Sequence, residues 1–170
     1  MGYSTYFSGS IAVDRPLREE HKAYLTAFSN TRRMQRDASL AADRPDPVRE
    51  AAGLPIGTEG GYFVGSTDNW GQERSVDVLD YNRPPAGQPS LWCQWVPDDD
   101  GTAIVHDGGD KFHEYVAWMC YIIEHFLDRW GYTLNGEIEW YGDDRADIGR
   151  IVVSDNVVTV KLGRIVFDGV

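Results

Sequence analysis

The sequence predicts an α+β fold: an antiparallel sheet of about five or six strands, two main helices packed on one face, and a long irregular middle region. Three observations lead to this expectation. Apolar and polar residues alternate near the start and over the last third of the chain, two segments carry apolar residues at helical spacing, and Pro and Gly gather between them. The 170 residues suit a single domain, 1–170, divided into 3–31, 32–90 and 91–170.

Residues 3–31 are expected to form a strand and a helix. Phe7, Ile11 and Val13 alternate with small or polar residues, which is the period of a half-buried strand. Pro16 suits the entry to a helix that begins near residue 18 or 19 and ends at about residue 31. The apolar stripe of this helix consists of Leu17, Tyr24, Leu25 and Phe28.

Residues 32–90 are expected to form an irregular, lid-like insertion. Asp46 and Pro47 followed by Gly53 predict a two-turn helix, and the sequence at 60–65 allows a short strand. The prolines between 82 and 89 exclude the interior of a helix or strand there. The insertion also carries large apolar residues that are costly to leave in water, so we expect it to pack over the core. They include Tyr62, Phe63, Val64, Trp70 and Leu79.

Residues 91–170 are expected to form a hairpin, a helix and a three-strand meander. Strands at 91–96 and 102–106 flank a turn at 98–101, and a helix at about 110–130 stops at Gly131. Strands at 132–141, 149–154 and 157–162 follow, with Asp155 and Asn156 as the tight turn between the last two. The apolar stripe of the second helix is wide, which indicates that the helix is covered on more than one side.

Composition limits the partners and the location. The chain has 16 Lys and Arg against 27 Asp and Glu, a net charge of −11. This balance disfavours direct binding to nucleic acid or anionic membranes and favours a basic protein partner. Cys93 and Cys120 stand among large apolar residues, so we expect buried thiols in a reducing compartment. The sequence shows no targeting segment and no cofactor motif, and we expect a cytoplasmic protein without a cofactor.

Two acidic turns are the basis of the first functional hypothesis. One contains Asp98, Asp99 and Asp100, and the other contains Asp143, Asp144 and Asp147. The second turn lacks the ligand spacing of a calcium loop, so no metal site is predicted. On this hypothesis the chain is an acidic soluble interaction protein, an inhibitor or decoy of phage or mobile-element type, whose acidic turns contact a basic partner.

The alternative hypothesis is a small enzyme or ligand-binding protein with a cleft under the middle region. The candidate residues are Arg32, Arg33 and Arg36 for a small anion, and Glu137, Glu139 and His106 as acid or base. Arginine makes forked contacts with carboxylate or phosphate, and two carboxylates on one strand face can divide acid and base roles. The sequence has no recognised nucleophile motif, so whether the protein is an enzyme stays open.

Segments near both ends of the chain carry a resemblance to known proteins. They are 6–11 (YFSGSI) and 135–144 (NGEIEWYGDD), the second continuing through 147–153 (DIGRIVV) and 155–158 (DNVV). These segments are similar to a family of small, uncharacterised bacterial and phage-associated proteins with a domain of unknown function. The resemblance covers roughly a third of the chain. It implies a fold, but no activity and no site residue.

Overall fold

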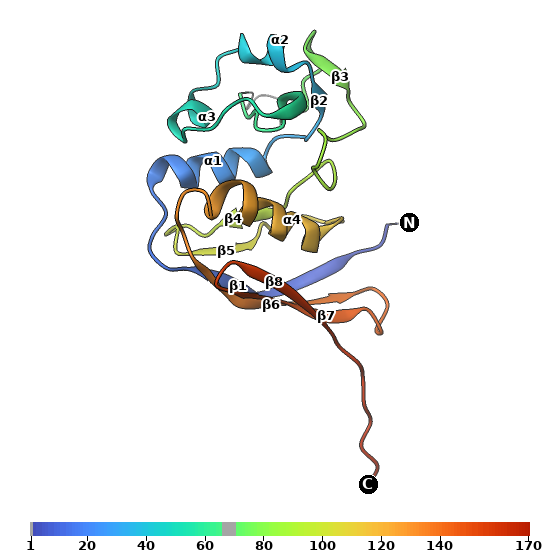
Figure 1. Ribbon diagram of the computed structural model, residues 1–170. Helices are drawn as coiled ribbons and strands as arrows, with labels where there is room; N and C mark the ends of the chain where they lie inside the picture. Colours follow the sequence, from blue (N-terminus) through green and yellow to red (C-terminus); the bar gives the residue numbers. More distant parts are fainter. Residues whose placement is uncertain (1, 66–70) are drawn as a thin grey trace.

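The computed structural model describes residues 2–65 and 71–170 and has the α+β architecture expected from the sequence (Figure 1). Its main sheet is six-stranded, in the order β4-β5-β1-β6-β7-β8, and every neighbouring pair is antiparallel. The strands are β1 (Thr5–Val13), β4 (Trp95–Pro97), β5 (Ala103–His106), β6 (Leu134–Gly142), β7 (Ile148–Ser154) and β8 (Val157–Leu162). The predicted hairpins around 98–101 and 155–156 are both confirmed.

Two glycines let β1 and β6 approach closely. These strands pair over nine residues, and Gly9 and Gly136 have positive φ angles of 108° and 151°. A Cβ atom at Gly9 would lie 2.6 Å from the Glu137 carbonyl oxygen, and one at Gly136 would lie 2.6 Å from the Ser10 carbonyl oxygen. A side chain does not fit at either position, so glycine is required at the centre of the sheet.

The helices α1 (Glu19–Ser29) and α4 (Tyr115–Ile122) cover one face of the sheet (Figure 1). A π-helix, η3 (Ile123–Leu127), continues α4. Their apolar side chains join inward residues of the sheet, such as Ile11 and Ile138, in one core, and the predicted apolar stripe of α1 is buried. α4 begins later than the predicted residue 110. The reason is that Lys111 and Glu114 have left-handed φ angles of 57° and 56°, which interrupt a helix before Tyr115.

The middle region forms a third layer, on the side of the helices that faces away from the sheet (Figure 1). It contains α2 (Ala38–Ala42), α3 (Pro47–Ala51), η1 (Thr58–Gly60) and a small sheet of β2 (Gln35–Arg36) and β3 (Val78–Asp80). Phe63 and Val64 are buried, and the Tyr24 hydroxyl of α1 donates to the Tyr62 carbonyl oxygen at 2.9 Å. The region is therefore packed on α1. Leu79 is exposed, and Trp70 lies outside the described residues.

Three local expectations are corrected. Residues 60–65, all described, form no strand, because Gly60 has a φ of 68° and its carbonyl oxygen accepts the Phe63 N–H in a turn. The strand expected at 91–96 is displaced to Trp95–Pro97. Cys93 is buried as expected, but Cys120 is exposed, because it lies on the polar stripe of its helix with residues 124 and 128.

In the described ranges, no helix is long and apolar enough to cross a bilayer.

Candidate functional site

The strand carboxylates lie on the open face of the sheet. In β6, Ile138 and Trp140 are buried towards the helices, so the period of two directs Glu137 and Glu139 to the opposite face. The guanidinium of Arg150 in β7 pairs with both, at 3.3 Å from Glu137 Oε2 and in a shorter contact with Glu139 Oε1. Both carboxylates are therefore members of a cross-strand ion-pair cluster at the surface.

Arg33, one of the predicted anion ligands, lies inside the protein. It is 2% exposed and donates to Gln88 Oε1 and to the carbonyl oxygens of Gly61 and Phe63. Its guanidinium also lies over the Phe28 ring, 4.0 Å from the centroid. Burial lowers the pKa of this guanidinium to about 10, so it is still charged at neutral pH. These contacts fasten the middle region to α1.

Arg36 is also buried, and a carboxylate neutralises its charge. Its Nη1 lies 2.6 Å from Asp77 Oδ2, and both side chains are almost completely buried. Arg44 contacts the other oxygen of the same carboxylate, Oδ1, at 3.0 Å. The prediction that Arg33 and Arg36 bind a small anion is therefore wrong, because both guanidinium groups are buried and bonded to internal partners.

The predicted cleft between the arginines and the strand carboxylates does not form among the described residues. The helices α1 and α4 lie between the middle region and the sheet (Figure 1). The alternation along β6 directs Glu137 and Glu139 away from these helices. The two groups are therefore on opposite sides of the molecule. The expectation that the arginines and the strand carboxylates share one cleft is therefore wrong.

His106 is separate from both groups and packs among aromatic rings. Its Nε2 lies 3.0 Å from Gln94 Oε1, and its ring is stacked on Phe112 with 5.7 Å between the centroids. The Asp107 carboxylate is more distant, at 3.8 Å from Nε2. Burial lowers the pKa of the His106 imidazole, so the ring is neutral at pH 7. These contacts are typical of a structural histidine that is packed and hydrogen-bonded, and less so of a catalytic base that is oriented by a carboxylate.

The two acidic turns lie at opposite ends of β1. The turn at 98–101 is followed by Thr102, whose carbonyl oxygen accepts the Val13 N–H at one end of the strand. The turn at 143–147 is bonded to Ser4 at the other end, through the Asp143 N–H. A strand of nine residues spans about 30 Å, so the two turns do not form one patch.

Carboxylates in both acidic turns are bonded within the fold. Asp98 accepts hydrogen bonds from the Thr102 and Ala103 N–H groups. Asp147 accepts hydrogen bonds from the Trp140 indole and the Tyr3 hydroxyl. The remaining carboxylates of the turns are exposed, namely Asp99, Asp100, Asp143 and Asp144. The exposed acidic charge of each turn is thus smaller than its sequence indicates.

A different hollow brings cationic side chains together. It has a volume of about 510 Å³ and lies where the proline-containing segment 84–92 meets the segment 111–114. Its lining consists of Pro84, Pro89, Ser90, Leu91 and Trp92 together with Arg32, Lys111, His113 and Glu114. The volume is within the range of small-molecule sites. We call it the Trp92 hollow.

Arg32 is held in a fixed orientation at the Trp92 hollow. Its Nε donates to the Tyr81 carbonyl oxygen at 3.0 Å, and its Nη2 donates to Asn82 Oδ1 at 3.2 Å. The guanidinium also lies over the Tyr81 ring, 4.1 Å from the centroid. Within the part of the chain that is described, its Nη1 has no hydrogen-bond partner. Because the side chain is already ordered, it would lose little freedom on binding an anion.

Lys111 and His113 reach the hollow from a strained segment. The left-handed φ angles of Lys111 and Glu114 are unfavourable for residues with a side chain, and such strain is frequent at functional sites. The His113 carbonyl oxygen accepts a hydrogen bond from Ser90 Oγ at 3.3 Å, which joins this segment to the opposite wall. Neither Lys111 nor His113 forms an ion pair with a described residue.

Arg32 is among the candidate anion ligands named from the sequence, and Lys111 and His113 are not among those candidates. Lys111 and His113 are far from Arg32 in the chain, and the sequence placed them in the first turns of a helix. The prolines between 82 and 89, which exclude regular structure, are the signal that could have indicated a binding loop.

Comparisons with known proteins identify no additional site residue. No family model matches the chain, and no curated protein or solved structure is significantly similar to it. Across residues 2–65 and 71–170, no group of three or more His, Cys, Asp or Glu side chains is placed to hold a metal ion. Geometry and charge are therefore the only grounds on which the Trp92 hollow can be interpreted.

Proposed function

We propose that the protein binds a small anionic ligand with an apolar or aromatic part in the Trp92 hollow. One observation carries the proposal: Arg32, Lys111 and His113 converge on an apolar hollow in a chain with a net charge of −11. Like charges repel, so placing Arg32 and Lys111 at one hollow without ion pairs costs free energy that a bound anion recovers. Glu114 also lines the hollow, but the two permanent cations outweigh this one carboxylate.

Each side of the hollow suits one part of such a ligand. Nη1 of Arg32 and the ammonium of Lys111 can donate charge-assisted hydrogen bonds to a carboxylate or phosphate. Trp92 and the neighbouring prolines provide an apolar surface on which a ring can lie. The proposal develops the ligand-binding hypothesis. Of the three arginines in that hypothesis, it retains only Arg32 as an anion ligand.

Phenyl phosphate is a suitable probe, because it combines an anion with a ring. We expect it to bind more tightly than inorganic phosphate, which lacks the apolar part, and more tightly than benzamide, which lacks the charge. Tryptophan fluorescence or NMR titration measures each affinity. Arg32→Ala and Lys111→Ala should each weaken binding by about tenfold or more, which is the effect of losing one charge-assisted hydrogen bond.

Arg145→Ala is the matched control for these variants. Arg145 is an exposed arginine in the acidic turn at 143–147, apart from the hollow, so its removal changes the net charge in the same direction and should leave the affinity unchanged. Unaltered affinity in both Arg32→Ala and Lys111→Ala would contradict the proposal. Tighter binding of benzamide than of phenyl phosphate would also contradict it.

Binding of a basic partner by the acidic turns stays a separate prediction. The turns are at opposite ends of β1, so each would act alone against such a partner. The resemblance to a family with a domain of unknown function and the cytoplasmic location also stay predictions.

A further inference from the structure

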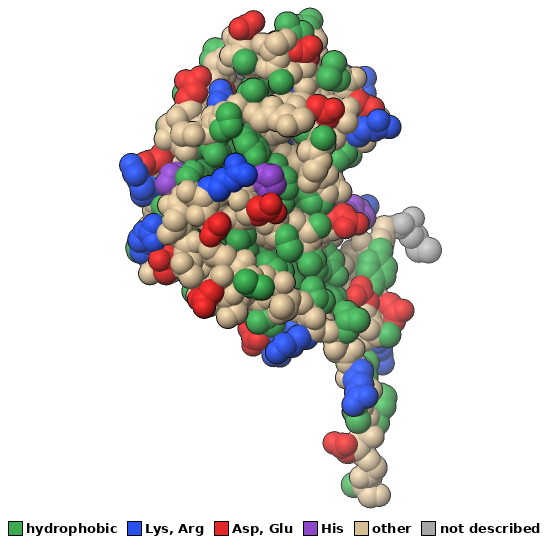
Figure 2. All heavy atoms as spheres, viewed as in Figure 1, with side chains coloured by type: hydrophobic (Ala, Val, Ile, Leu, Met, Phe, Trp, Pro, Cys, Tyr) green, Lys and Arg blue, Asp and Glu red, His purple; other side chains and the backbone are tan. Residues whose placement is uncertain are grey.

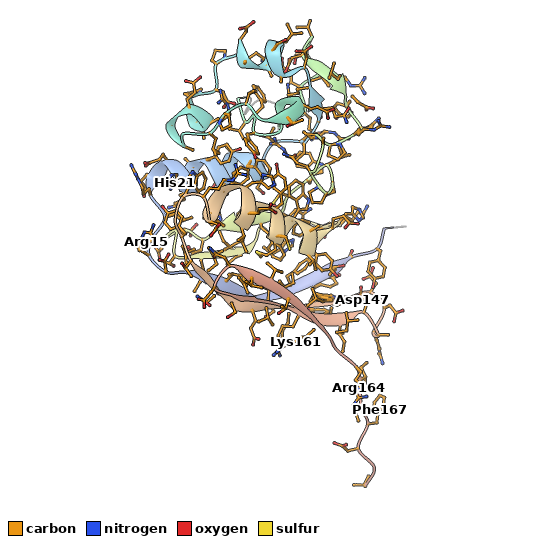
Figure 3. All side chains as sticks on the ribbon, in the orientation of Figure 1. Arg15, His21, Asp147, Lys161, Arg164 and Phe167 are labelled. Carbon is orange, nitrogen blue, oxygen red and sulfur yellow. The ribbon has the colours of Figure 1, made fainter. Side chains whose placement is uncertain are left out.

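The segment 162–170 leaves the body of the protein at the end of β8 and continues in an extended form (Figure 1). Its large apolar side chains are open to solvent, with Leu162 82%, Val166 65% and Phe167 90% exposed. Figure 2 shows basic, apolar and acidic side chains along this projection, and Figure 3 shows Arg164 and Phe167 clear of the sheet. Such a concentration of exposed apolar side chains indicates a contact surface.

The order of residues in this segment is complementary to itself. The segment can be paired with an antiparallel copy so that Val166 stands on a twofold axis. The opposed pairs are then Leu162–Val170, Gly163–Gly169, Arg164–Asp168, Ile165–Phe167 and Val166–Val166. Opposite charges face each other, apolar residues face apolar residues, and glycine faces glycine. Opposed residues share a face of the ribbon, so Ile165 and Phe167 of both copies form one apolar cluster.

We propose that a second copy of this chain pairs with the segment and forms an antiparallel ribbon through residues 162–170. β8 is an edge strand of the sheet, so the backbone groups of Leu162 on the side away from β7 are open to a partner strand. Arg164 and Asp168 have no ion-pair partner among the described residues, and the ribbon provides one for each. The order of charged and apolar residues therefore favours a second copy over an unrelated strand.

The interface is small. If a fully exposed large side chain offers about 150 Å², then Leu162, Ile165, Val166 and Phe167 of two copies bury at most on the order of 900 Å² at their observed exposures. A standard stable interface buries roughly 1,600 Å², and a lone two-stranded ribbon is marginal in water. We therefore expect a reversible dimer that dissociates on dilution.

Sedimentation equilibrium of the full chain tests this dimer. The parent protein should approach twice 19.1 kDa as the concentration rises. Arg164→Asp and Asp168→Arg, made singly, place like charges opposite each other at two symmetric positions and should raise the dissociation constant about tenfold or more. The double variant restores opposite charges in the reversed order and should dimerise like the parent.

Arg145→Asp is the control, because it changes the net charge by the same amount as Arg164→Asp at an exposed turn. It should leave the dissociation constant unchanged. A parent protein that is monomeric at every concentration would overturn the proposal, and so would a segment that folds back on its own chain. The proposal would also be overturned if the single charge reversals left the dissociation constant unchanged, or if the double variant dimerised as weakly as the single variants.

Discussion

Replacement of Arg33 by alanine should lower the free energy of unfolding by about 4–8 kcal/mol. The change leaves two buried acceptors without donors, the Phe63 carbonyl oxygen and Gln88 Oε1. Each unsatisfied acceptor costs about 1–3 kcal/mol, and the cavity left beside Phe28 adds about 2 kcal/mol. A loss of this size is a large part of the about 5–15 kcal/mol that stabilises a typical domain.

Urea unfolding followed by tryptophan fluorescence measures this loss. Arg33→Met is a second variant that fills most of the volume and removes only the donors, so it should lose about 2–6 kcal/mol. Arg32→Ala is the matched neighbour: its side chain is half-buried at the surface, and its removal should change stability by about 1 kcal/mol or less. The contrast separates a structural arginine from one that is available to a ligand.

A loss below about 1 kcal/mol in Arg33→Ala would refute this reasoning, because it would mean that the buried guanidinium does not hold the middle region. An equal loss in Arg32→Ala would also refute it, since the two neighbouring residues would then have the same role.

Two further changes test the interior. Asp77→Ala should lower the unfolding free energy by about 3–5 kcal/mol in the same titration, because it leaves the buried Arg36 without its carboxylate, whereas the exposed Asp99→Ala should cost less than about 0.5 kcal/mol. Stability should also fall as the pH drops through about 6.5, because burial lowers the pKa of His21 in the folded state and the unfolded chain then binds more protons. The urea midpoint of unfolding, measured at about pH 8 and at about pH 5, should differ less in His21→Gln than in the parent protein. A parent midpoint that is the same at both pH values would contradict the prediction.

The fold class could be predicted because its signals are local. The alternation of Ile138 and Trp140 with Glu137 and Glu139 identifies both the strand and its buried face. The start of α4 could not be predicted in the same way. Residues 111–114 include no glycine or proline, so nothing in their composition indicates the left-handed φ angles that delay the helix.

The site could be predicted only in part, because burial is decided by residues distant in the sequence. Arg32, Arg33 and Arg36 are equivalent by composition and spacing. Arg33 and Arg36 differ from Arg32 because they are buried against acceptors from distant parts of the middle region, namely Gln88 and Asp77. No local pattern carries that information, so three similar arginines were assigned one role when the structure buries two of them.

The acidic net charge and the cationic Trp92 hollow act over different distances. A net charge of −11 repels an extended polyanion along its whole length, which disfavours nucleic acid. On the proposed function, a small anion in the hollow would contact Arg32 and Lys111 directly, while charges farther away than about 8 Å are screened at physiological ionic strength. The proposal therefore predicts that the local cations control the binding of a small anion, whereas the net charge opposes a large one. Phenyl phosphate should bind more tightly than a single-stranded oligonucleotide, and the reverse order would contradict this reasoning.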